Sequence, residues 1–245
     1  ALDLQADMNQ QHGLFENNGT PWIYCMLHNF GGRSGLHGRM QNLAEGYFAA
    51  EQRATCKGIG ATPEGIETNP ALYDFLFELP WMSSQPNSDE WLKEYSYARY
   101  GVNPDDNALA WEALKNLRKS VWNCTRDQQG TSEAIILGRP RWTFGDNSRG
   151  SMNNLDGTSV SSWSKSSIYW DVQDVMLAAD NLISISDLVT TDDGEANFSY
   201  DLIDITRQSL VDFAYYLLQD INAARNAGND EEYRRLYTIF LDLML

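Results

Sequence analysis

Cations, cysteine, histidine and long apolar runs are all scarce in this chain of 245 residues. Lys and Arg total 18 against 34 Asp and Glu, so the formal net charge is −16, and His contributes only 3 residues. Nucleic-acid binding needs clustered Lys and Arg side chains, so this charge argues against a nucleic-acid partner. It also disfavours a polyanionic ligand such as a heavily sulfated glycan.

Missing motifs disfavour several further features. The cysteines Cys25, Cys56 and Cys124 are widely spaced and form no Cys-x-x-Cys pair, so neither a zinc site nor a disulfide framework is expected. Gly31-Gly32 is accompanied by no phosphate-loop or dinucleotide motif, so we expect no cofactor. No apolar run reaches the roughly 18 residues that would span a membrane.

What the chain does contain is typical of a globular protein with a large core. Its hydrophobic content is 42%, and it has 8 Trp and 12 Tyr. Aromatic rings of this number suit a protein that stacks sugars, and they suit core packing equally well. Composition alone therefore leaves both roles open.

Two kinds of secondary structure follow one another along the chain. Strand-like runs at 1–7, 22–28 and 57–62, with a helical stretch at 39–53, predict a parallel βαβ unit. From residue 69 the signals are helical, and the predicted helices cover 69–79, 88–101, 103–120, 171–188, 200–227 and 230–245. The segment 127–165 is rich in Gly, Ser, Asn and Asp and is predicted to be a long irregular loop. The predicted fold class is therefore α/β followed by all-α.

Polar side chains follow each of the three predicted strands. Asp7 follows the first strand, His28 and Asn29 the second, and Glu64 the third. In a parallel β/α barrel such residues share the rim that carries the active site. Capping alone also places polar residues at the start of such loops, so the pattern leaves a catalytic and a capping role open for Glu64.

A specific resemblance extends over nearly the whole chain. Its first part runs through Trp22-Ile-Tyr-Cys-Met-Leu-His-Asn-Phe-Gly-Gly32 and Thr62-Pro-Glu-Gly-Ile66. The later parts, in the same order, are the stretch from Trp91 to Gly101, Ser120-Val-Trp-Asn-Cys124, Arg139-Pro140, Ser167-Ile-Tyr-Trp170 and Tyr200-Asp-Leu-Ile-Asp-Ile-Thr-Arg-Gln208. In these motifs the chain resembles the α-N-acetylglucosaminidases of glycoside hydrolase family 89.

The resemblance implies a fold and a catalytic role. Residues 1–80 would be the last strands of a TIM (β/α)8 barrel, and residues 81–245 part of a helical C-terminal domain. Glu64, in the Pro-Glu-Gly motif, would be the nucleophile of a retaining exo-glycosidase. The family's general acid/base is a glutamate that follows Asn on an earlier strand. No such motif is present, so we expect the chain to lack this group and to be inactive in isolation.

The implied substrate is a glycan with a terminal α-linked N-acetylglucosamine. Its 2-acetamido group lies on the same side as the leaving group and cannot displace it from behind, so a protein carboxylate is needed. Predicted contacts to the sugar come from Asp7, Tyr24, His28, Asn29 and Trp170. For Tyr24 and Trp170 simple packing is the alternative. Heparan sulfate and mucin-type glycans are both family substrates, and the negative charge favours the neutral mucin type.

Two other functions remain as alternatives. One is a non-catalytic helical module that binds carbohydrate, and the other is a cysteine hydrolase that uses Cys25 and His28. Cys25 and His28 are three residues apart, which places them on opposite sides of a strand and favours a buried Cys25 instead. The resemblance also predicts an exported protein and association with the N-terminal remainder of the same enzyme, and it leaves a homo-oligomer open.

Overall fold

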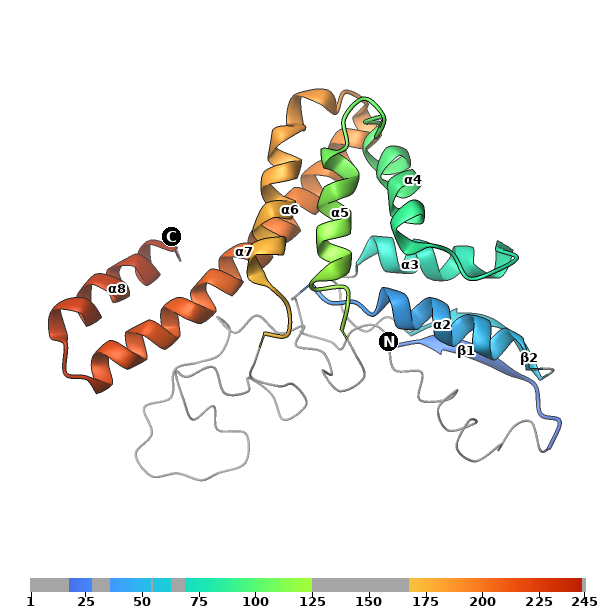
Figure 1. Cartoon of the computed structure of the whole chain (residues 1–245), viewed down its shortest axis with the longest axis horizontal. Coiled ribbons are helices and arrows are strands. Elements are labelled where there is room, and N and C mark those ends of the chain that lie inside the picture. Colours follow the sequence, from blue (N-terminus) through green and yellow to red (C-terminus); the bar gives the residue numbers. More distant parts are fainter. Residues whose placement is uncertain (1–17, 28–35, 54, 63–68, 125–167, 244–245) are drawn as a thin grey trace.

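The computed structural model describes residues 18–27, 36–53, 55–62, 69–124 and 168–243 (Figure 1). In its first part the strands β1 (Trp22–Met26) and β2 (Cys56–Ala61) pair in parallel, and the helix α2 (Met40–Glu51) lies between them in sequence. The predicted strand–helix–strand unit is confirmed for these elements. The strand predicted at 1–7 lies outside the described residues, and the assignment of β1 and β2 to a complete barrel stays a prediction.

The helix α2 covers one face of this small sheet (Figure 1). Along β1 the side chains of Trp22, Tyr24 and Met26 are buried, while Ile23 between them is 46% exposed. This alternation is the period of a strand with one face on the core. The helix supplies buried apolar residues to the same core, at Met40, Leu43, Ala44, Tyr47 and Ala50.

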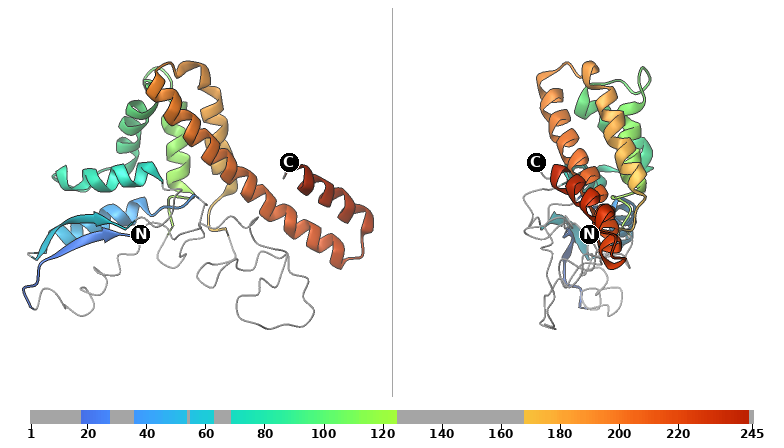
Figure 2. Two further views of the ribbon diagram at one scale, coloured as in Figure 1. Left: turned by 180° about the vertical axis from the view of Figure 1, so that it is seen from behind. Right: turned by 90° about the vertical axis from the view of Figure 1, so that its left-hand side faces the viewer.

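The rest of the described chain is helical. The helices are α3 (Pro70–Glu78), the 3-10 turn η1 (Leu79–Trp81), α4 (Ser88–Tyr100), α5 (Leu109–Lys119), α6 (Val172–Ser184), the 3-10 turn η4 (Ser186–Leu188), α7 (Asp192–Asn226) and α8 (Asp230–Leu243). Helices α4 to α7 pack side by side as a bundle next to the sheet (Figure 1). Figure 2 shows α8 folded back along the C-terminal half of α7, on the side away from the sheet.

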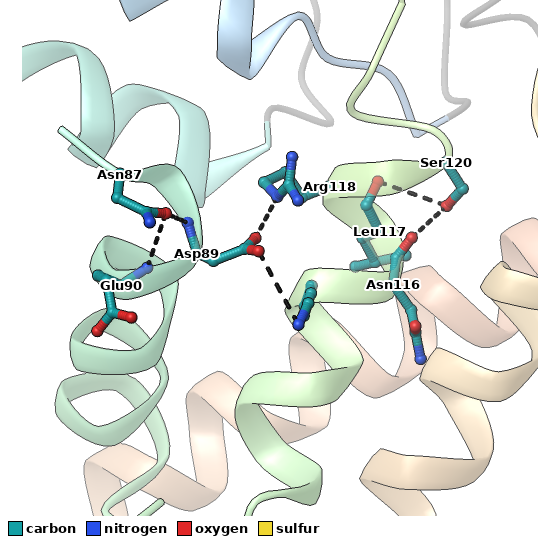
Figure 3. Close-up of polar contacts among 8 residues, drawn as sticks. Asn87, Asp89, Glu90, Asn116, Leu117, Arg118 and Ser120 are labelled. Atoms are coloured by element: carbon teal, nitrogen blue, oxygen red, sulfur yellow. Dashed lines mark hydrogen bonds and ion pairs between the residues drawn. The ribbon is translucent and has the colours of Figure 1, made fainter. Parts of the chain in front are cut away.

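Local signals explain where α4 begins and ends. The Asn87 side chain accepts from the backbone N–H of Asp89 at 2.9 Å and of Glu90 at 3.4 Å, so Asn87 is the cap (Figure 3). Gly101 ends the helix in the left-handed conformation, with φ 73°, which favours glycine. Both ends agree with the predicted range within one residue.

An ion-pair cluster joins α4 to α5. The Asp89 carboxylate pairs with Arg118 (Figure 3) and lies 3.9 Å from the Lys115 ammonium. At the end of α5 the Ser120 hydroxyl donates to the Asn116 carbonyl at 2.6 Å (Figure 3). The Asp89 contacts thus hold α4 against α5, and the Ser120 bond closes the last turn of α5.

Two predicted helix starts are wrong, and for different reasons. The helix α5 begins at Leu109 and not at residue 103, because the side chains of Asn103 and Asn107 accept from the backbone N–H groups of Asp105 and Leu109 in local turns. The helix α7 begins at Asp192, eight residues before the predicted 200. Its cap is the Thr191 hydroxyl, which accepts from the backbone N–H of Gly194 at 3.1 Å.

A buried ion pair joins α4 to α7 inside the bundle. The Arg99 guanidinium makes two bonds to the Asp201 carboxylate, and Tyr100 donates its hydroxyl to the same carboxylate at 2.7 Å. The side chains of Arg99 and Asp201 are only 11% and 13% exposed. Because both partners are largely removed from water, loss of either would leave the other charge uncompensated.

Candidate active site

Both connections that carry predicted site residues leave the same edge of the sheet. The register pairs Met26 with Ala61 at the carboxyl ends of the strands, and the N–H of Thr62 donates to the Met26 carbonyl at 2.9 Å. His28 follows Met26 by two positions, and Glu64 follows Thr62 by two positions. The two connections therefore start side by side, as a shared site requires.

The predicted site residues themselves are described only in part. Asp7, His28, Asn29 and Glu64 lie outside the described residues, so their roles stay predictions. The structure does describe the residues next to these connections, which we call the frame: residues 36–40, 69, 121–124, 169–170, 208 and 212. They show how the chain is held where it returns from these connections.

The junction segment, residues 36–40, carries the chain from the first connection into α2. The N–H of Gly38 donates to the Val121 carbonyl at 3.1 Å, and the N–H of Met40 donates to the Trp122 carbonyl at 3.0 Å. The Gly38 carbonyl accepts from the N–H of Cys124 at 2.9 Å. A Cβ at Gly38 would lie 3.1 Å from the Trp122 Cα, so this approach of two backbones favours glycine.

Asn69 links the second connection to the junction segment. We expect an Asn directly before Pro70 to cap α3, yet its side chain makes no capping hydrogen bond. Its amide instead donates to the His37 carbonyl at 3.5 Å. Asn69 is 4% exposed, so the contact is buried. The residues on which the two connections converge are thereby held together.

Trp170, the predicted sugar contact that precedes α6, is fixed by its indole nitrogen. Its Nε1–H donates to Asp212 Oδ2 at 2.8 Å, and its ring meets Tyr169 edge-on at 4.6 Å between centroids. The Tyr169 hydroxyl donates to the Val121 carbonyl at 2.7 Å and lies 3.4 Å from His37 Nδ1. Trp170 is only partly buried. Its packing is thus established, and its contact with sugar stays a prediction.

Tyr24, unlike Trp170, lies fully inside the core. Its side chain is 1% exposed, its hydroxyl donates to the Leu43 carbonyl at 3.4 Å, and its ring meets Tyr47 edge-on at 6.2 Å between centroids. The hydroxyl also lies against the Cα of Gly46, where a Cβ would clash with it. These contacts favour the packing role that the sequence left open for Tyr24.

Two residues of the frame were missed by sequence reasoning. Gln208 and Asp212 lie one turn apart on α7, are 3% and 1% exposed, and are joined by a bond of 2.8 Å from Gln208 Nε2 to Asp212 Oδ1. The Gln208 oxygen accepts from the backbone N–H of Leu36 at 2.7 Å. Polar residues four positions apart within an apolar helix face were the available signal.

Burial dominates the electrostatics of this frame. It raises the pKa of Asp212 from its ordinary 3.8 to about 6, against the opposite effect of the bonds from Trp170 and Gln208. Burial also raises the pKa of Tyr169 well above its usual range, so its hydroxyl stays a donor. Among the described residues, no group of three or more His, Cys, Asp or Glu side chains could hold a metal ion. Within the same ranges, no helix has the length and apolarity of a membrane span.

Models of known protein families match both parts of the chain. The family model of the α-N-acetylglucosaminidase (NAGLU) TIM-barrel domain matches residues 1–83, and that of the α-N-acetylglucosaminidase (NAGLU) C-terminal domain matches residues 91–245. A curated relative, α-N-acetylglucosaminidase of Homo sapiens, is 30% identical over 210 residues, which are 84% of this chain and 25% of the relative.

Solved structures of a family 89 glycoside hydrolase from Clostridium perfringens are similar in fold as well as in sequence. The structure in complex with PUGNAc matches with a TM-score of 0.78 and 32% identity, over 94% of this chain and 24% of that one. A form with two glutamates replaced by glutamine, in complex with its substrate GlcNAc-α-1,4-galactose, matches with the same TM-score and identity over 95% of this chain. The chain spans about a quarter of the length of these relatives.

Proposed function

Because the chain belongs to the α-N-acetylglucosaminidase family of glycoside hydrolases, we propose that it contributes the nucleophile to a retaining exo-α-N-acetylglucosaminidase. The nucleophile is Glu64. The observation that carries this proposal is the parallel edge at Met26 and Thr62, from which the connection bearing Glu64 and the one bearing His28 start together.

The chemistry of an α-linked N-acetylglucosamine supports a protein nucleophile. The acetamido group cannot attack from behind the anomeric carbon, so an ionised carboxylate forms the covalent glycosyl intermediate. A second carboxyl about 5–5.5 Å away protonates the leaving oxygen and then activates water. In our proposal this second group is supplied from outside residues 1–245, by the remainder of the same enzyme.

The proposed substrate is a neutral glycan that ends in α-linked N-acetylglucosamine. The relative from Clostridium perfringens was solved with GlcNAc-α-1,4-galactose as its substrate, and that disaccharide carries no charge. The net charge of −16 favours the same class over a sulfated chain. Comparison of kcat/KM for the neutral disaccharide and for a sulfated oligosaccharide with the same terminal sugar tests the preference, and a higher value for the sulfated one would overturn it.

Substitution of Glu64 by Gln in the intact enzyme tests the catalytic proposal. We expect kcat to fall by about 10³-fold or more, because the amide cannot attack the anomeric carbon. Added azide should restore turnover and release a β-glycosyl azide. Glu45→Gln is the matched control, since Glu45 is exposed on α2 and should tolerate the same change. Turnover within about twofold of wild type in Glu64→Gln would reject the proposal.

A mechanism-based label separates catalysis from mere recognition of the sugar. A fluorinated glycosyl donor should leave a covalent sugar on Glu64, which peptide mass spectrometry locates. A non-catalytic sugar-binding module would bind the reagent and release it unchanged. A label on Cys25, or inactivation by thiol alkylation alone, would instead support a cysteine hydrolase.

A further inference from the structure

Gln208 and Asp212 form a buried polar pair in an otherwise apolar part of the bundle. Their neighbours on the same helix, Ile205, Val211 and Ala214, belong to its buried face. Burial of a carboxylate is unfavourable unless hydrogen bonds replace the lost water. Each side chain therefore needs partners, and the partners found are informative because they come from two distant parts of the chain.

The pair joins three segments in one chain of hydrogen bonds. The N–H of Leu36 donates to Gln208 at 2.7 Å, Gln208 donates to Asp212 at 2.8 Å, and the Trp170 indole donates to the second Asp212 oxygen at 2.8 Å. Apolar side chains of the same size would fill the space but would leave the Leu36 and Trp170 donors unpaired. The pair thus fixes the orientation of the Trp170 ring and of the backbone at Leu36, which packing alone would not do.

We propose that Gln208 and Asp212 are positioning residues of the active site, through which α7 holds the Trp170 ring and the junction segment in fixed relation. The inference rests on the proposed function, because it takes Trp170 as a residue that faces the sugar. It adds a role for the helical part of the chain, because α7 would then orient one wall of the site.

Several ionisable groups surround the pair. Tyr169, next to Trp170, interacts electrostatically with Asp212 and also with Arg39 and Cys124, and its hydroxyl lies 3.4 Å from His37 Nδ1. Asp212 accepts from two donors as a carboxylate, whereas a protonated carboxyl gives up part of this capacity. Protonation of Asp212 should therefore loosen the Trp170 bond, with a midpoint at the pKa of about 6.

The first test follows Trp170 in the intact enzyme labelled with fluorotryptophan. Trp170→Phe assigns its fluorine resonance by loss of one signal. We expect this resonance to shift with pH around the Asp212 pKa of about 6, and to stop shifting in Asp212→Asn. A resonance that does not titrate, or one that titrates unchanged in Asp212→Asn, would overturn the proposal. If Asp212→Asn does not fold, His37→Gln replaces it, and loss of the titration in that variant counts against Asp212.

The second test is a double-mutant cycle on kcat/KM with an aryl α-N-acetylglucosaminide. If Asp212 acts through Trp170, Asp212→Asn and Trp170→Phe should each lower kcat/KM about tenfold, and the double variant should be little worse than either one. Multiplied losses, or no loss in Asp212→Asn, would overturn the proposal. Asp220→Asn makes the same charge change at an exposed site of α7 and should leave kcat/KM unchanged.

These readouts separate the two proposals. The Trp170 titration does not depend on hydrolysis, so a normal titration with an active Glu64→Gln variant would reject the nucleophile and leave the positioning role intact. An absent titration with an inactive Glu64→Gln variant would reject the positioning role alone.

Discussion

The backbone N–H of Leu36 donates to the side-chain oxygen of Gln208 at 2.7 Å, although the two residues are 172 positions apart. The bond ties the segment that enters α2 to the middle of α7. Both residues are buried, so water cannot replace either partner. Through this bond the sheet region and the helical region share one network of hydrogen bonds.

Removal of the Gln208 side chain should therefore destabilise the fold. In Gln208→Ala the Leu36 N–H and one Asp212 oxygen lose their partner, so we expect the free energy of unfolding to fall by about 1–3 kcal/mol. Urea denaturation measures the change. Gln219→Ala, at a partly exposed position of the same helix, is the control and should change stability by less than about 0.5 kcal/mol. Equal effects at the two positions would contradict the role of the bond.

The Tyr24 hydroxyl leaves no room for a side chain at Gly46, so a substitution at Gly46 should destabilise the fold and a second one at Tyr24 should relieve the effect. A Cβ at Gly46 would meet the Tyr24 hydroxyl first and two ring carbons at 3.2 Å. Gly46→Ala should lower stability by about 1–3 kcal/mol, despite the helix-favouring effect of Ala. Tyr24→Phe removes the clashing oxygen and should restore part of the loss in the double variant. Gly58→Ala is the control, because its nearest neighbour would be 3.8 Å away.

The pKa of Asp212 predicts a pH dependence of stability. Between its ordinary 3.8 and the raised value of about 6, the folded state holds a proton that the unfolded state has released. The resulting stabilisation is complete below the lower value and is lost as the pH rises through about 6. A pKa difference of this size corresponds to about 3 kcal/mol.

Asp212→Asn cannot take up this proton, so it isolates the effect. The stability of wild type relative to Asp212→Asn should fall by up to about 3 kcal/mol from about pH 4 to about pH 7. Denaturant unfolding at each pH measures the difference. Asp220→Asn, at an exposed site, should show no such trend. A flat difference between wild type and Asp212→Asn would mean that Asp212 has an unshifted pKa.

The buried and exposed ion pairs should differ sharply in their contribution. Asp201→Ala leaves the Arg99 guanidinium and the Tyr100 hydroxyl without their shared acceptor, and we expect a loss of about 3–5 kcal/mol. Asp105→Ala removes the surface partner of Lys93 and should change stability far less, because water screens an exposed pair. Thermal unfolding of the two variants side by side measures the contrast, and similar melting temperatures would contradict it.

Element types were readable from the sequence where the signals are local. A short apolar run that ends in polar and Gly residues identified β1, and the start and stop signals at Ser88 and Gly101 located α4. The start of α5 was misplaced because an Asn side chain that caps a helix and one that closes a turn look alike in sequence. The start of α7 was misplaced because the Thr191 cap was not recognised. Asn69 shows the same limit, since its amide serves the His37 carbonyl and does not cap the helix it precedes.

By itself the sequence determined the order of strands and helices, the family, and Glu64 as the predicted nucleophile, because these depend on residues close together in the chain. Only the tertiary structure decided that Tyr24 is a core residue and that Gln208 and Asp212 hold Trp170 and Leu36. Those partners lie 42 and 172 positions apart, and no periodic pattern records which distant donor a buried acceptor will meet. Packing of α7 against the junction segment makes that choice, because a buried polar group without a partner costs free energy.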